Sequence, residues 1–91
     1  MNIEHLDNYI YIKDKNKEVG HIQYNKIDEN VIDVITTYVN TDYRGQGIAG
    51  KLFDELVLFS REHHYKIIAS CSYIKKKLES STEYEDIRYY G

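Results

Sequence analysis

The chain has 91 residues, 42% of them hydrophobic and 30% charged, and a net charge of -3 at pH 7. This length predicts one domain over residues 1–91 with a single core, and the negative charge disfavours non-specific binding to nucleic acid, which needs clustered positive charge. No apolar run approaches a membrane span, the N-terminus lacks the regions of a signal peptide, and one cysteine forms no internal disulfide, so we expect a cytoplasmic protein that binds neither nucleic acid nor membranes.

The first predicted elements form a β-hairpin. Tyr9 to Lys13 and Glu18 to Tyr24 are short extended runs, and the polar segment Asp14 to Lys17 separates them. Within the first run, Ile10 and Ile12 fall on one side and the tyrosines fall on the other. This alternation is typical of a strand within a sheet.

A longer strand is predicted after a second polar turn at Ile27 to Asn30. Residues Val31 to Asn40 are apolar on both faces, as is typical of a central strand. One face would carry Val31, Ile35 and Val39, and the other Ile32, Val34 and Tyr38. This strand is the best candidate to carry chemistry, because it leads into a glycine-rich loop.

The second half of the chain predicts a crossover unit. Apolar residues recur at helical spacing from about Gly47 to His64: Ile48, Leu52, Leu56 and Phe59. A strand at Lys66 to Ser72 follows, which makes a right-handed βαβ unit with the central strand. A short helix around Ile74 to Leu78 and an extended end near Tyr84 to Tyr90 complete the chain. Together the elements predict an α/β or α+β fold with a mixed sheet.

The glycine-rich loop fits three phosphate-binding patterns. Gly45 to Gly50 reads GxGxxG, Gly45 to Lys51 reads GxxxxGK, and Arg44 to Ala49 reads [Q/R]xxGx[G/A]. In all three, glycines let the backbone approach a phosphate, and the unpaired N–H groups of the following helix favour an anion. The loop therefore predicts a phosphorylated ligand.

Two of these patterns fail on their remaining residues. A P-loop requires Ser or Thr after its lysine to hold Mg²⁺, and Leu52 stands there. A dinucleotide site requires an acidic residue after the next strand. That strand ends instead in Cys71, Ser72 and Tyr73, and too little chain follows for a doubly wound sheet. The pattern from Arg44 to Ala49 remains.

The segment VITTYVNTDYRGQGIAGKLFDEL resembles motif A of the GNAT superfamily of acyl-CoA-dependent N-acetyltransferases. The order of predicted elements extends the resemblance over nearly the whole chain. More narrowly, the chain looks like a compact GNAT-like group in which a cysteine lies in the strand after the motif-A helix. The resemblance implies a reduced GNAT-like fold: a mixed, mostly antiparallel sheet with the motif-A helix and a short C-terminal helix.

The resemblance also implies a co-substrate, acetyl-CoA or another acyl-CoA, and no metal. Backbone N–H groups from Arg44 to Ala49 would hold the coenzyme A diphosphate, and a free N–H near Tyr38 and Val39 would bind the acyl carbonyl. The implied binding residues are Tyr38, Val39, Arg44, Gly45, Gln46, Gly47, Ile48, Ala49, Gly50, Cys71 and Tyr73. Lys51 and Lys75 to Lys77 are further candidates, for the adenosine 3'-phosphate.

Two side chains are candidate catalytic residues. Cys71 is either a small buried hydrophobe or a thiol that lines the site and accepts the acyl group. Tyr84 resembles the C-terminal tyrosine that protonates the leaving thiolate in many GNAT enzymes. Tyr73, Tyr89 and Tyr90 are alternatives for that role, and packing is the alternative for each of them.

The general base and the acceptor stay open. His21, Glu18 and Asp33 are candidate bases on the predicted sheet, and Thr36 and Thr37 could bind substrate. The helices that form the acceptor pocket in full-size GNAT enzymes are absent between the first two strands, so the amine could belong to a peptide, a protein or a small molecule. A non-catalytic module that binds or senses coenzyme A is the alternative. It would bind acetyl-CoA without turnover.

Overall fold

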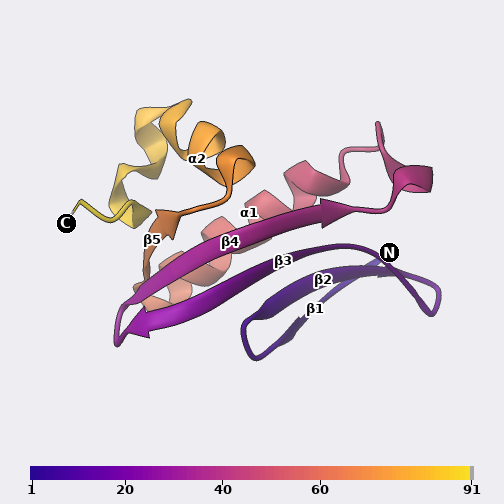
Figure 1. Ribbon diagram of the computed structural model, residues 1–91, viewed down its shortest axis with the longest axis horizontal. Helices are drawn as coiled ribbons and strands as arrows, with labels where there is room; N and C mark the ends of the chain where they lie inside the picture. The colour runs from indigo at the N-terminus through magenta and orange to yellow at the C-terminus, as the bar shows by residue number, and fades with distance from the viewer. Residues whose placement is uncertain (91) are drawn as a thin grey trace.

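The computed structural model describes residues 1–90 and has a five-stranded sheet in the order β1-β2-β3-β4-β5 (Figure 1). The strands are β1 (Asn2–Leu6), β2 (Tyr9–Asp14), β3 (Lys17–Asp28), β4 (Val31–Val39) and β5 (Lys66–Ala69). The helices are α1 (Ile48–His63) and α2 (Ser72–Glu79), with 3-10 turns η1 (Thr41–Tyr43) and η2 (Thr82–Ile87). Strands β1 to β4 pair antiparallel, and β4 pairs parallel with β5. The predicted hairpin, βαβ unit and mixed, mostly antiparallel sheet are thereby confirmed.

The two ends of the chain differ from prediction. Strand β1 was not predicted, and it forms a hairpin with β2 through a tight turn at Asn8, whose φ is 65°. The extended end predicted at Tyr84 to Tyr90 is wrong, because most of it is the turn η2. The Ser81 side chain accepts a hydrogen bond from the Glu83 N–H at 3.2 Å and starts this turn. Only Arg88 forms a parallel bridge, with Ile67.

Helix α1 runs alongside β4 across one face of the sheet (Figure 1), and the core lies between them. Ile10 and Ile12 of β2 are fully buried there, as their alternation predicted. The largest fully buried side chains are Phe53, Ile10, Ile12, Ile22, Ile32, Ile48, Leu52, Leu56, Ile74 and Ile87. Neither helix of residues 1–90 has the length and apolar character needed to span a bilayer.

A β-bulge at Ile35 changes which residues of β4 face α1. Tyr24 pairs with Val34, whereas Gln23 pairs with Thr36, so Ile35 is an extra residue in the ladder. Beyond the bulge, Thr37 pairs with the buried Ile22 and therefore shares its face. The prediction that Tyr38 shares a face with Ile32 and Val34 is wrong, because the bulge reverses the alternation.

Candidate functional site

The end of β4 has a free edge. Strand β5 stops at Ala69, and its pairing with β4 ends at Val34. The Cys71 N–H still donates to the Val34 carbonyl at 2.9 Å, but the chain then turns away into α2. The edge of β4 beyond Ile35 is consequently not covered by β5. The predicted gap between the two strands is present.

One backbone donor points into this gap. The Asn40 N–H donates to the Val19 carbonyl at 2.8 Å, toward β3. Since N–H groups of an antiparallel strand alternate between its two edges, the Val39 N–H points to the free edge. The donor to an acyl carbonyl was predicted near Tyr38 and Val39. Of these two, it is the Val39 N–H that points toward the gap.

A groove of about 460 Å³ lies between the free end of β4 and the start of α1. It is lined by Thr37, Val39, Tyr43, Arg44, Gly45, Gly47, Ile48, Ala49, Gly50 and Tyr73. Eight of the predicted binding residues line it. Tyr38 and Gln46 do not, and Cys71 adjoins it through Thr37. Tyr43 was not predicted; its hydroxyl donates to Asp14 at 3.0 Å, a contact between distant segments that leaves no sequence signal.

The loop before α1 exposes backbone donors to the groove. Gly45 and Gly47 have φ angles of 84° and 77°, which disfavour residues with side chains. The first hydrogen bond of the helix runs from the Lys51 N–H to the Gly47 carbonyl at 3.0 Å. The N–H groups of Ile48 to Gly50 come before this bond and have no acceptor within the helix. The first turn of α1 has no acidic residue and no side-chain cap. Its positive dipole end is therefore available to an anion.

Cys71 is the N-cap of α2 and not part of β5. The prediction that it lies within the strand is wrong, because the strand ends two residues earlier. Its Sγ lies 3.3 Å from the Thr37 Oγ1. Partial burial raises the pKa of the Cys71 thiol, but the Thr37 hydroxyl and nearby backbone groups, including those of Tyr73 and Ile74, outweigh burial and lower the pKa below its ordinary value.

We expect iodoacetamide to alkylate Cys71 with a midpoint pH below that of a free thiol, because the thiolate is the reactive form. Thr37→Val removes one hydrogen bond to the sulfur and should raise this midpoint. Mass spectrometry of the alkylated protein against pH measures it. Thr36→Val is the matched control, since Thr36 pairs with Gln23 on the opposite face. Equal midpoints in wild type and Thr37→Val would show that this contact does not stabilise the thiolate.

Of the four candidate tyrosines, Tyr73, Tyr84, Tyr89 and Tyr90, only Tyr73 lines the groove. Burial is the main cause that raises the pKa of its phenol. The Tyr84 ring packs edge-on against Phe53, with centroids 5.1 Å apart, and does not line the groove. Tyr73 is therefore the better placed proton donor.

The family model described as GCN5-related N-acetyl-transferase matches residues 8–87. The chain belongs to this family. The match covers both the hairpin and the glycine loop, and it agrees with the resemblance seen in the sequence. Among curated protein sequences no significant match was found.

Solved structures of GNAT proteins have the same fold. A GCN5-like protein from Staphylococcus aureus is 37% identical with a TM-score of 0.77, and the alignment covers 97% of this chain and 87% of that one. A ribosomal-protein-alanine N-acetyltransferase from Brucella melitensis is 22% identical with a TM-score of 0.62, covering 91% of this chain and 63% of that one. A GNAT acetyltransferase from Elizabethkingia anophelis with acetyl-CoA bound is 20% identical with a TM-score of 0.63. That alignment covers 79% of this chain and 50% of that one.

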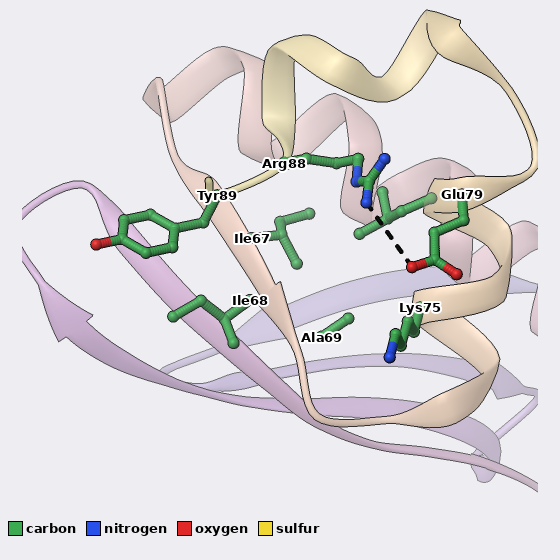
Figure 2. Close-up of a pocket in the computed structure, with 8 residues that line it drawn as sticks. Ile67, Ile68, Ala69, Lys75, Glu79, Arg88 and Tyr89 are labelled. Atoms are coloured by element: carbon green, nitrogen blue, oxygen red, sulfur yellow. Dashed lines mark ion pairs between the residues drawn. The ribbon is translucent and has the colours of Figure 1, made fainter. Parts of the chain in front are cut away.

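Of the lysines predicted to bind a 3'-phosphate, Lys75 and Lys77 lie away from the groove of this GNAT protein. Lys75 lines a separate hollow of about 320 Å³ at the outer edge of β5, where Arg88 and Tyr89 also lie (Figure 2). The same hollow contains the ion pair of Arg88 with Glu79, whose nitrogen and oxygen are 3.8 Å apart. The Lys77 Nζ lies 5.4 Å from the centroid of the Phe53 ring. Lys51, exposed on the first turn of α1, is the candidate on the element that forms the groove.

Proposed function

We propose that this protein is an acetyl-CoA-dependent N-acetyltransferase, which transfers an acetyl group from coenzyme A to an amine. The observation that carries this proposal is the groove itself, which joins the unpaired N–H groups at the start of α1 to the free edge of β4. A diphosphate matches the unpaired N–H groups, and a thioester carbonyl matches the free edge of β4. The acetyl-CoA bound to the Elizabethkingia protein supports this choice of ligand.

Each part of the groove has a distinct role in this proposal. The N–H groups of Ile48, Ala49 and Gly50 bind the diphosphate, and the Arg44 guanidinium adds a charge-assisted contact. The Val39 N–H donates to the carbonyl oxygen, where negative charge develops as the amine attacks. Cys71 lies beside this end of the groove, through its contact with Thr37.

The groove also contains a candidate proton donor for the leaving thiolate. When the tetrahedral intermediate collapses, the carbon–sulfur bond breaks and coenzyme A leaves as a thiolate. A phenol has an ordinary pKa of about 10, and burial raises the pKa of Tyr73 further, so Tyr73 keeps its proton at neutral pH and can protonate the sulfur. The amine loses one proton to a base, which the residues of the groove do not supply.

Amide shifts on adding coenzyme A test the binding site. We expect the largest changes from Arg44 to Gly50 and at Val39, and no comparable change with ATP and Mg²⁺. Release of free thiol from acetyl-CoA in the presence of a panel of amines then tests catalysis. Shifts confined to other residues would contradict the proposed site. Binding to this loop without turnover of any amine would favour a non-catalytic coenzyme A module instead.

A further inference from the structure

Three side chains form a hydrogen-bonded cluster on the sheet face opposite α1. The Tyr9 hydroxyl donates to the Glu18 Oε1 at 2.6 Å. The His21 Nδ1 lies 2.9 Å from the Glu18 Oε2 and 2.8 Å from the Tyr9 oxygen. The rings of Tyr9 and Tyr38 flank the imidazole, with centroids 4.8 Å and 5.3 Å from its own. The cluster joins β2, β3 and β4 at one place.

The hydrogen bonds fix the protonation pattern of the cluster. Because Nδ1 of His21 faces a carboxylate, the neutral ring carries its proton there, and Nε2 holds the lone pair. Burial and the Glu18 carboxylate raise the pKa of Tyr9 to about 12, so its phenol remains a donor. None of the hydrogen bonds found among residues 1–90 uses Nε2 of His21. The cluster therefore presents a carboxylate and a free basic nitrogen.

The neighbouring charged groups are already paired. Lys13 Nζ lies 3.1 Å from Glu4 Oε2, and the Tyr11 hydroxyl donates to the same carboxylate at 3.1 Å. The Tyr11 ring lies beside that of Tyr9, with centroids 5.6 Å apart. Thus Glu18 is the negative charge that faces His21 directly, and the rings of Tyr9 and Tyr38 flank the imidazole. An ammonium group suits both the charge and the ring faces.

The cluster lies across β4 from the groove. Tyr38 pairs with His21 and is 43% exposed on the open face. The residues on either side of Tyr38, Thr37 and Val39, face the groove because of the bulge at Ile35. At Tyr38 only the backbone of β4 separates the cluster from the groove, and the edge of β4 there is not covered by β5. A side chain lying over Tyr38 can therefore reach around this edge to the thioester.

We propose that Tyr9, Glu18, His21 and Tyr38 form the acceptor subsite, which binds a primary alkylammonium group and removes its proton through Nε2 of His21. This inference rests on the proposed transferase function. An alkyl amine has a pKa of about 10.4 and is protonated at neutral pH, so it must lose a proton before its nitrogen attacks. One ammonium proton passes to Nε2 and then to solvent, and the neutral nitrogen forms its bond to the carbonyl carbon. As the carbon–sulfur bond breaks, the thiolate takes a proton from Tyr73, and the second proton lost by the nitrogen replaces it on Tyr73 through solvent. The acceptor is therefore a primary alkyl amine.

Binding of n-butylammonium chloride to the isotope-labelled protein saturated with coenzyme A tests the subsite. We expect amide shifts at Tyr9, Glu18, His21 and Tyr38, no such shifts with n-butanol, and at least about fivefold weaker binding in Glu18→Gln. His5→Gln is the matched control, because His5 forms the other histidine–glutamate pair found in residues 1–90, with Glu55 at 2.6 Å. Shifts that map elsewhere, or equal binding in Glu18→Gln and wild type, would overturn the proposal.

Kinetics with spermidine and acetyl-CoA provide the second readout. His21→Gln should lower kcat about 100-fold, with KM for acetyl-CoA unchanged. A kcat for His21→Gln equal to that of His5→Gln would overturn the role of the base. The two proposals fail separately, because loss of the transferase function would appear as absent coenzyme A binding at Arg44 to Gly50 in the wild type.

Discussion

Replacing Ala49 with glutamate is expected to weaken coenzyme A binding about 100-fold, roughly 2.7 kcal/mol, without unfolding the protein. Ala49 lies in the first turn of α1 and lines the groove, so the carboxylate would stand at the proposed diphosphate site. Two like charges about 4 Å apart at a protein surface repel by about 4 kcal/mol. In the free protein the same carboxylate faces the positive end of the helix dipole and should stabilise α1 by about 0.3–1 kcal/mol.

The opposite signs of these two effects separate binding from folding. Isothermal titration with coenzyme A gives the dissociation constant, and thermal unfolding without ligand gives the stability. Leu58→Glu is the matched control, because Leu58 is 58% exposed on the same helix and the charge change is identical. If Ala49→Glu binds coenzyme A as tightly as Leu58→Glu, the diphosphate does not lie at the start of α1.

The glycine loop could be located from sequence because its constraints are local. Gly45 and Gly47 adopt left-handed φ angles, and α1 begins at Ile48, one residue from the predicted start. Neither fact depends on distant parts of the chain. The helical periodicity that follows is equally local, so the element that carries the proposed diphosphate site was predictable almost to the residue.

The faces of β4 could not be predicted in the same way. The bulge at Ile35 arises from pairing with β3, where Gln23 and Tyr24 are adjacent but their partners are not. Simple alternation assigned Tyr38 to the face of Val34, and the extra residue reverses that assignment. Strand β1 was missed for a related reason. Its residues are mostly exposed, so Asn2 to Leu6 have little apolar pattern to detect.

The tight connection between β2 and β3 has a consequence for the proposed acceptor subsite. Lys17 follows Asp14 after two residues, Lys15 and Asn16, so no helix enters between these strands. The Tyr9, Glu18 and His21 cluster consequently forms directly on the sheet from adjacent strands. The sequence named Glu18 and His21 as candidate bases, but only the register that pairs Tyr11 with His21 brings them to Tyr9.

Phe53→Ala is expected to lower the free energy of unfolding by about 3–5 kcal/mol. The Phe53 side chain is fully buried in α1, and its ring contacts Tyr84 of η2 edge-on and the Lys77 ammonium of α2. Truncation would leave a cavity where these three elements meet. A small domain has about 5–15 kcal/mol of total stability, so this loss is a large part of it.

Urea unfolding, followed by circular dichroism, measures the effect, and Phe59→Ala is the matched control. Phe59 lies on the same helix but is only partly buried, against the edge of the core, so its truncation should cost less. Coenzyme A should raise the unfolding midpoint of Phe53→Ala, since binding to the folded state alone adds stability with ligand concentration. A cost for Phe53→Ala no greater than for Phe59→Ala would show that η2 and α2 are not anchored to α1 through this ring.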